Sequence, residues 1–257
     1  MSIHPTAVIA PGAELDATVE VGPYAVIGPR VKIGPRTKVG ALAVIEGHTT
    51  IGADNHIFHH TSVGAIPQDL KYAGEPTKLV IGDKNQIREF ATVHLGTAQG
   101  GGVTRVGSSC LLMANSHVAH DCVVGDHVVI ANSSALAGHV VVEDHVIFGG
   151  LSGVHQFSRV GQYAFISGGA MVTMDVPPYC CAQGDRAQLS GLNTVGLTRA
   201  GFTPEAIARV KAAYKMVFRG GLGLREALAR VTAEFGGHPE IDHFVRFIEG
   251  SERGIAR

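Results

Sequence analysis

The feature that most constrains the fold of this chain is an internal repeat with a period of six residues. Large aliphatic residues occupy every sixth position from Ile3 to Val63, again from Ile81 to Val93, and after a slip from Val106 to Val172. Of these 26 positions, 25 are Ile, Leu or Val, and the exception is Phe148. A repeat of this kind predicts a solenoid, in which each unit buries its apolar face against its neighbours.

Two further positions of the six-residue unit are also restricted. Four residues after each large aliphatic residue the side chain is mostly small, which predicts one large and one small inward residue on each side of a narrow prism. The position directly after the large residue is often Gly, which suits a corner where a side chain clashes or needs a forbidden backbone angle. The glycines at this position are Gly22, Gly28, Gly34, Gly40, Gly52, Gly64, Gly82, Gly107, Gly125, Gly149 and Gly161.

The repeat is interrupted twice, near residues 68–79 and near residues 99–105. Insertions in a solenoid form loops on one face, which is often the binding face, so both stretches are expected to loop outward. The second contains Gly100, Gly101 and Gly102. These three do not match a phosphate-binding glycine motif between a strand and a helix, so we expect a flexible loop there.

After Pro177 and Pro178 the repeat ends, and the sequence becomes helical in character. Thr203 followed by Pro204 is typical of a helix N-terminus, and apolar residues then recur at helical spacing. Further helices are expected over 224–235 and 240–249. The sequence therefore predicts a mainly β solenoid over residues 1–176 and a linker with a small α-helical domain over 177–257.

Composition excludes several other classes of protein. The 257 residues include 34 Gly without a Gly-X-Y period, and 45% of the residues are hydrophobic, so neither collagen nor disorder is expected. A net charge of −1 argues against nucleic acid as the main partner. Neither a membrane-spanning apolar run nor a secretory signal is recognisable, and the four Cys suit reduced thiols, so a cytoplasmic protein without membrane insertion is expected.

Histidines gather in the second half of the repeat. With about 18 residues per coil, His120, His139 and His155 fall on neighbouring coils along one edge of the prism. A histidine accepts a proton near neutral pH, which suits activation of a hydroxyl or amine nucleophile. A zinc site and a purely structural ladder of stacked polar side chains are the alternatives.

Five segments together resemble the UDP-N-acetylglucosamine O-acyltransferases of lipid A biosynthesis, and the resemblance covers essentially the whole chain. The segments are Gln68–Thr77, His117–Asp121, Leu136–His139, His155–Phe157 and Asp175–Tyr179. The resemblance implies a left-handed parallel β-helix in a homotrimer whose active sites lie between subunits. It also implies transfer of a 3-hydroxyacyl group from acyl carrier protein to the glucosamine 3-hydroxyl of UDP-N-acetylglucosamine, with no cofactor and no metal.

Roles for individual residues also follow from the resemblance. His120 is expected to be the general base, with Asp121 orienting it and the N–H of Gly138 stabilising the oxyanion. Gly168 is expected to set the acyl-chain ruler, and its missing side chain favours a chain of about 14 carbons. The expected substrate-binding residues are Gln68, Asp69, Lys71, His117, His139, His155, Gln156, Asn193 and Arg199.

Lys211, Lys215 and Arg219 recur at helical spacing and form a basic stripe. Docking of the acidic acyl carrier protein is one interpretation of the stripe, and a solvated helix face is the other.

Other functions remain open at the level of sequence. Val195, Ala200 and Arg186 differ from residues that are frequent in the family, so the acceptor is either the ordinary sugar or a 3-amino analogue. The related N-acyltransferase of the same pathway carries an extra N-terminal domain, whereas the repeat here begins at Ile3. A coenzyme A-dependent acetyltransferase and a noncatalytic β-helix scaffold are the remaining alternatives.

Overall fold

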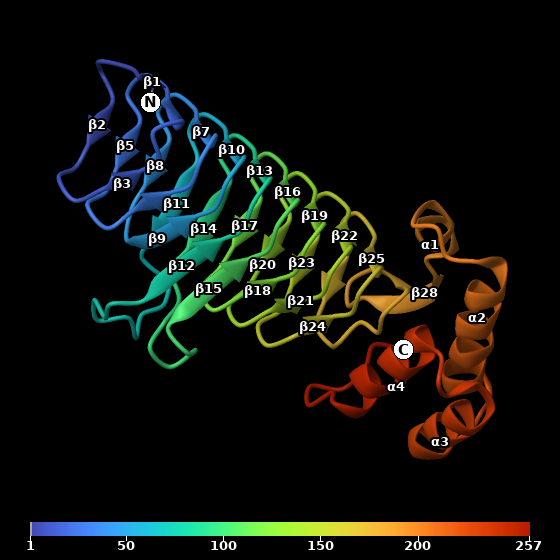
Figure 1. The fold of residues 1–257 in the computed structure, drawn as a ribbon. Helices are drawn as coiled ribbons and strands as arrows, with labels where there is room; N and C mark the ends of the chain where they lie inside the picture. Colours follow the sequence, from blue (N-terminus) through green and yellow to red (C-terminus); the bar gives the residue numbers. More distant parts are fainter. Residues whose placement is uncertain (1) are drawn as a thin grey trace.

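The computed structural model describes residues 2–257 and contains a long three-sided prism followed by a group of helices (Figure 1). Within those residues the strands form three sheets of 11, 9 and 8 strands. Up to β27, successive strands along the chain belong to different sheets, and each pairs in parallel with the strand one coil away, as Val26 does with Val44. The fold is therefore the left-handed parallel β-helix with a helical C-terminal part that the sequence led us to expect.

Most strands are two residues long, as a six-residue unit with a corner requires. The first sheet contains β1 (Ser2–Ile3), β4 (Glu20–Val21), β7 (Lys38–Val39), β10 (His56–Ile57), β13 (Gln86–Ile87), β16 (Leu111–Leu112), β19 (Val129–Ile130), β22 (Ile147–Phe148), β25 (Phe165–Ile166), β27 (Cys180–Gln183) and β28 (Gln188–Leu192). The second contains β2 (Val8–Ile9), β5 (Val26–Ile27), β8 (Val44–Ile45), β11 (Ser62–Ala65), β14 (Thr92–His94), β17 (His117–Val118), β20 (Ala135–Leu136), β23 (Gly153–Val154) and β26 (Met171–Val172). The third contains β3 (Glu14–Leu15), β6 (Lys32–Ile33), β9 (His48–Ile51), β12 (Lys78–Ile81), β15 (Val103–Val106), β18 (Val123–Val124), β21 (Val141–Val142) and β24 (Arg159–Val160).

The interior of the prism is filled by the two inward positions of each repeat. The large aliphatic residues, such as Ile27, Ile45 and Leu136, are fully buried, and each contributes about 1.5–3 kcal/mol relative to an exposed side chain. The small residues four positions later are buried beside them. Asn55 and Asn85 occupy two of these small positions, and their side chains satisfy backbone groups of the neighbouring coils. The predicted pairing of one large and one small inward residue is confirmed.

The glycines after the large residues serve close packing of the coils rather than a left-handed backbone. Of the eleven, only Gly64 has a positive φ. If Gly40 carried a side chain, its Cβ would lie 2.6 Å from the backbone nitrogen of His59 in the next coil. A Cβ added to Gly149 would lie 2.5 Å from the backbone nitrogen of Gly168. The left-handed corner falls two residues later, where 17 non-Gly residues, including Asp121 and His139, have φ near +60°. At nine of the other ten a Cβ would lie under 3.0 Å from another atom, and at Gly28 the nearest atom is 3.2 Å away, so steric clash is the main reason for these glycines.

The chain leaves the coil twice, over residues 66–77 between β11 and β12 and over residues 95–102 between β14 and β15. Figure 1 shows both loops projecting from the same part of the prism. The predicted loops were too long at their C-terminal ends. Lys78 and Leu79 belong to β12, and Val103 to Arg105 belong to β15. Pairing of β12 with both β9 and β15 over four residues draws them back into the sheet.

Beyond the repeat, an antiparallel hairpin of β27 and β28 continues the first sheet, and four helices follow it. They are α1 (Thr194–Arg199), α2 (Pro204–Arg219), α3 (Leu224–Phe235) and α4 (Pro239–Glu249). The predicted start of α2 is confirmed, because the Thr203 hydroxyl accepts from the N–H of Ala206 and Pro204 occupies the first turn. The expectation missed the hairpin and α1, which are short and lie outside any periodic pattern.

Helix α4 and the residues after it are bound to the last coils of the prism. The His243 imidazole lies 2.7 Å from the Glu143 carboxylate, and the Arg159 guanidinium donates to the Gly250 carbonyl at 2.9 Å. The same guanidinium lies 4.3 Å above the ring of Phe247. Among the described residues, no helix is both long and apolar enough to cross a lipid bilayer.

Candidate active site

The carboxylate of Asp121 is a buried charged group at the left-handed corner after β17. Its side chain is fully buried. One oxygen accepts from the Thr97 N–H at 2.8 Å, and the other accepts from the Thr97 hydroxyl at 2.6 Å. The N–H of Asp121 donates to the Thr104 hydroxyl at 2.8 Å. The two bonds from Thr97 fix the carboxylate in one orientation.

The loop over residues 95–102 forms the space that holds this carboxylate. A Cβ at Gly96 lies 2.8 Å from an Asp121 oxygen, and one at Gly100 overlaps the carboxyl group. Gly100 and Gly102 both donate their N–H to the carbonyl of Thr97. The glycine run, expected to be a flexible loop, is thus a hydrogen-bonded turn that packs against Asp121.

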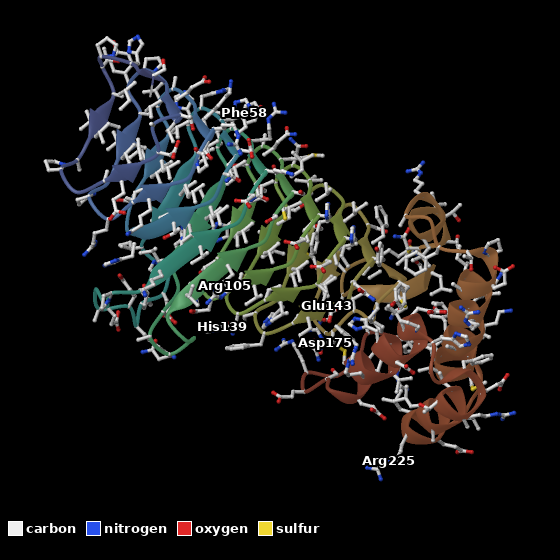
Figure 2. The ribbon with its side chains drawn as sticks, in the orientation of Figure 1. Phe58, Arg105, His139, Glu143, Asp175 and Arg225 are labelled. Carbon is white, nitrogen blue, oxygen red and sulfur yellow. The ribbon has the colours of Figure 1, made fainter. Side chains whose placement is uncertain are left out.

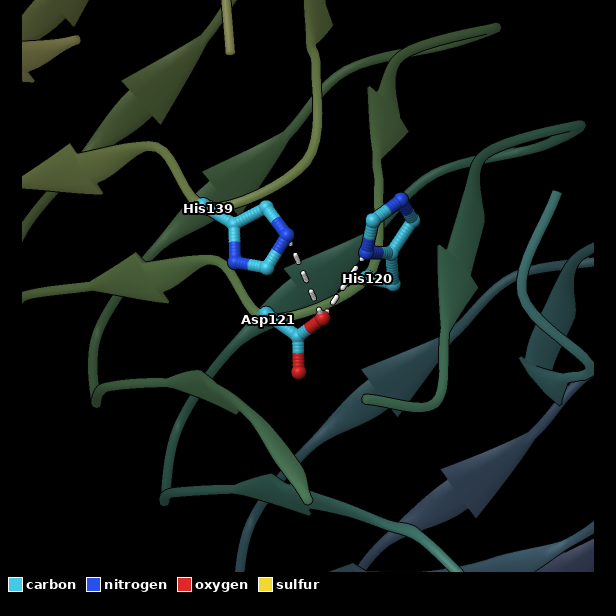
Figure 3. A group of neighbouring side chains, drawn as sticks. All are labelled: His120, Asp121 and His139. Atoms are coloured by element: carbon cyan, nitrogen blue, oxygen red, sulfur yellow. Dashed lines mark hydrogen bonds and ion pairs between the residues drawn. The ribbon is translucent and has the colours of Figure 1, made fainter. Parts of the chain in front are cut away.

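His120 precedes Asp121 and lies against its carboxylate. The His120 Nδ1 is 2.8 Å from Asp121 Oδ2, and only 13% of the His120 side chain is exposed (Figure 3). Because a carboxylate only accepts, Nδ1 carries the proton and donates it to this bond. The Nε2 of a neutral His120 then has a free lone pair, which is the arrangement of a general base held by an acid.

Gly138 and His139 complete this end of the site. A Cβ at Gly138 lies 2.5 Å from Cε1 and 2.7 Å from Nε2 of His120, so only glycine leaves room for the ring. His139 meets His120 edge to face with ring centroids 5.1 Å apart, and its Nε2 is 3.8 Å from Asp121 Oδ2. Burial lowers the pKa of His139, and the Asp121 carboxylate partly opposes that shift. The ring also stacks on Phe157.

His120, Asp121 and His139 also present three potential metal-ligand atoms within 4.8 Å of one another. The zinc site left open as an alternative therefore has an acidic candidate ligand, because Asp121 lies within reach of both imidazoles. The Asp121 oxygens already accept from Thr97 and His120, so an ion has to displace the His120 proton. Hydrogen bonding therefore accounts for the cluster without a metal.

Two more histidines lie next to His120, and one of them was missed by the sequence reasoning. His117 on β17 contacts the Thr92 hydroxyl through Nδ1 at 2.7 Å, and burial lowers its pKa. His94, at the end of β14, meets His117 edge to face at 4.9 Å and is 5% exposed. Its Nδ1 has no hydrogen-bond partner within residues 2–257, and burial lowers the pKa of His94 to about 4.

A groove of about 560 Å³ runs over β17, β20, β23 and β26 beside these histidines. It brings together six of the predicted site residues, which are Gln68, His117, His120, Gly138, His155 and Gln156. His139 lies just beyond the groove, and the nearby Asp69 carboxylate is among the charges that act on it. Lys71 is exposed, and its N–H donates to Asp69 at 2.9 Å.

The remaining predicted residues lie elsewhere on the chain. Asn193 caps α1 and, with Arg199, Val195 and Ala200, lines a second cavity of about 580 Å³ against the first sheet. Lys211, Lys215 and Arg219 line a hollow of about 290 Å³ beside α2. Gly168 lies at the corner after β25, where a Cβ meets only the Gly150 backbone, at 3.3 Å. None of these eight lines the groove at His120 in the part of the chain that the structure describes.

Comparison with known proteins agrees with this architecture over its whole length. Curated relatives from Anaeromyxobacter sp. (strain Fw109-5) and Myxococcus xanthus are 61% and 64% identical, over 100% and 99% of both chains, and both are named acyl-[acyl-carrier-protein]--UDP-N-acetylglucosamine O-acyltransferase. This chain belongs to the UDP-N-acetylglucosamine O-acyltransferase family. The resemblance inferred from the sequence motifs is confirmed.

Solved structures and family models of these O-acyltransferases match as well. The Moraxella catarrhalis enzyme is 44% identical with a TM-score of 0.98 and full coverage of both chains. The Acinetobacter baumannii protein is 45% identical with a TM-score of 0.97, and 99% of each chain is covered. The model of domain 2 of UDP-N-acetylglucosamine O-acyltransferase matches residues 175–256, and the bacterial transferase hexapeptide model matches residues 104–138. Membership of this acyltransferase family excludes the noncatalytic scaffold.

Proposed function

We propose that this chain transfers a 3-hydroxyacyl group from acyl carrier protein to the glucosamine 3-hydroxyl of UDP-N-acetylglucosamine, the first step of lipid A biosynthesis. Relatives at 61–64% identity carry the name of this reaction. The observation that supports it most strongly within the molecule is the His120 imidazole, held by a buried carboxylate at the wall of a groove. That pair suits removal of a proton from a hydroxyl group.

The reaction proceeds by direct attack. The Nε2 of His120 takes the proton of the sugar 3-hydroxyl while its oxygen attacks the thioester carbonyl carbon. Asp121 keeps the other ring proton on Nδ1 and stabilises the imidazolium that forms. The N–H of Gly138 donates to the tetrahedral oxyanion. The carbon–sulfur bond then breaks, and His120 returns the proton to the departing thiolate, so no acyl-enzyme is formed.

The other groove residues bind the substrates in this proposal. Gln68, His117, His155 and Gln156 line the groove and contact the sugar nucleotide or the acyl group. Asp69, Lys71 and His139 bind the substrates from positions beside the groove. Gly168 sets the length of the acyl chain, and its lack of a side chain leaves space for a long chain. Lys211, Lys215 and Arg219 dock the acidic carrier protein.

We further propose a homotrimer in which each site combines two subunits. Asn193 and Arg199 line a cavity separate from the groove on their own chain, so a neighbouring copy has to bring them to His120. Co-expression of two inactive variants, His120→Asn and Asn193→Ala, tests this arrangement. Mixed trimers regain activity because some sites combine two intact halves. If the mixture stays inactive, the proposal that two subunits share each active site is wrong.

In this proposal the two parts of the chain have different functions. Residues 1–176 form the coils that carry the acid–base groups, and residues 177–257 supply nucleotide contacts and carrier docking. A cytoplasmic location is also part of the proposal. All four cysteines are free, as is usual in a reducing compartment.

The decisive experiment combines purified protein with UDP-N-acetylglucosamine and hydroxymyristoyl acyl carrier protein, followed by mass spectrometry of the product. Wild type makes a 3-O-acyl product, and His120→Asn does not. Parallel reactions contain the 3-amino sugar nucleotide, or carrier proteins with shorter chains in competition. Absence of the O-acyl product overturns the proposed acceptor, and preference for a chain of about 10 carbons overturns the role of Gly168.

A further inference from the structure

A contact between the end of the chain and the groove carries a role that the mechanism above does not use. The Nη2 of Arg253, in the tail after α4, lies 2.8 Å from the Nδ1 of His155. The Nε of the same guanidinium donates to the Thr173 carbonyl at 2.8 Å. Both His155 and Thr173 line the groove that contains His120. Arg253 therefore reaches the back of the site from a segment 98 residues away in sequence.

The backbone on both sides of Arg253 is fixed to the prism. The Ser251 hydroxyl donates to the Asp175 carboxylate at 2.8 Å. Asp175 donates its N–H to the Gly254 carbonyl, and its own carbonyl accepts from Ala256, both at 2.9 Å. Ile255, between these two contacts, is buried. Asp175 lies at the junction of the prism and the C-terminal helices (Figure 2), so the guanidinium is held by a segment that is hydrogen-bonded to the prism rather than by a free end.

The chemistry of the guanidinium decides which nitrogen of His155 carries the proton. Arginine only donates hydrogen bonds, so Nδ1 must accept, and the proton of a neutral His155 then lies on Nε2. The Gln156 carbonyl, 3.1 Å from the same Nδ1, favours the opposite tautomer. The contact to Arg253 is shorter and is assisted by a full positive charge, so it prevails.

The groove thus contains two histidines with opposite hydrogen-bonding roles. Asp121 makes the Nε2 of His120 an acceptor, whereas Arg253 makes the Nε2 of His155 a donor. We propose that Arg253 is a positioning residue that holds His155 as a neutral hydrogen-bond donor toward an anionic phosphate oxygen of the substrate. This inference rests on the proposed function, in which both substrates contain phosphate.

Charge on the far side of His155 supports an anionic ligand. A cavity of about 840 Å³ shares His155 and Thr173 with the groove, and Arg186, Arg253 and Arg257 line it. Three guanidinium groups behind a single hydrogen-bond donor stabilise an anionic phosphate oxygen more than an uncharged ligand oxygen.

A double-mutant cycle tests the positioning role in the full-length protein. Arg253→Gln raises the KM of one substrate about tenfold or more, with little change in kcat. Arg253→Lys recovers part of the loss because an ammonium also donates to Nδ1. The substrate whose KM rises, UDP-N-acetylglucosamine or the acyl carrier protein, identifies the phosphate. In a His155→Ala background, Arg253→Gln has no further effect.

Arg225→Gln is the matched control, because Arg225, on α3, lines neither the groove nor the cavity behind His155 and lies well away from His139 (Figure 2). A structural role for Arg253 predicts the same loss with and without His155, together with a lower melting temperature, and that result overturns the inference.

Nitrogen-15 NMR of histidine-labelled protein tests the tautomer without any substrate, with His155→Ala used for assignment. Wild type carries the His155 proton on Nε2, and Arg253→Gln loses this preference. A proton on Nδ1 in wild type overturns the inference even if the enzyme is active. An inactive enzyme with the Nε2 proton in place instead contradicts only the proposed function.

Discussion

The two ends of the catalytic groove use the same side chain in opposite ways. At one end an acidic residue, Asp121, accepts a hydrogen bond from His120, and at the other a guanidinium, that of Arg253, donates one to His155. The loop over residues 95–102 fixes Asp121 at the first end, and the tail after α4 supplies Arg253 at the second. The regular coils place both imidazoles on one wall, but segments outside the repeat decide which nitrogen donates and which accepts. The chemistry of this prism therefore depends on what is added to the repeat.

Removing the acceptor histidine tests the acid-backed end most severely. His120→Asn keeps a polar side chain but has no group that takes the hydroxyl proton. We expect kcat to fall about 100-fold to 10,000-fold, with KM values nearly unchanged. Steady-state kinetics with both substrates measure the change, and His4→Gln, at an exposed site near the first strand, is the control. A variant with more than half the wild-type kcat excludes His120 as the base.

Replacing the acid alone asks whether it acts through the tautomer. In Asp121→Asn an NH₂ group replaces one carboxylate oxygen, and the Thr97 N–H requires the remaining oxygen. The NH₂ then donates to His120 Nδ1, which moves the ring proton to Nε2 and removes the base. A loss of kcat of about 100-fold or more is expected. If Asp121→Asn retains activity, Asp121 does not determine which nitrogen of His120 carries the proton. The proposed contrast between the two ends of the groove is then wrong.

His94 sharpens the comparison because it is a buried histidine without a charged partner. Its pKa is lowered from 6.5 to about 4, so below about pH 6.5 the unfolded chain binds a proton that the folded chain does not. Stability is therefore complete above that pH and is lost as pH falls, by about 3 kcal/mol near pH 4. Urea unfolding of wild type and His94→Leu at pH 7 and pH 5 measures the effect. The variant loses less stability on acidification, and parallel curves for the two proteins contradict this origin.

Gly138→Ala tests how closely the coil fits the acid-backed ring. The added methyl group lies 2.5 Å from the His120 ring and has to displace it, so kcat falls about tenfold while the fold persists. Gly150→Ala is the matched control, because its Cβ meets only the Asn132 carbonyl, at 3.3 Å. Circular dichroism establishes that both variants fold. Equal kcat in the two variants shows that His120 tolerates displacement.

Much of this arrangement is readable from the sequence, and the exceptions have physical causes. The period of six residues predicts the prism, its core positions and the shared wall of His120 and His155, because coils of fixed length convert spacing into proximity. The proximity of His94 to His117 was not predicted, because residues 95–102 leave the coil between them and change the spacing. Thr97 and Arg253 were not predicted either. Their contacts depend on how a loop and a tail fold back, which no period encodes.

The basic stripe on α2 provides the smallest expected effect and a third test of what lies beyond the repeat. Lys211, Lys215 and Arg219 line one hollow and do not contact the groove, so reversing their charges leaves kcat unchanged. The KM for the acyl carrier protein rises several-fold at low salt, and the difference from wild type shrinks as salt screens the charges. The KM for the sugar nucleotide stays constant. If the carrier KM is also constant, the stripe is a solvated helix face, and the segments beyond the repeat act on the groove alone.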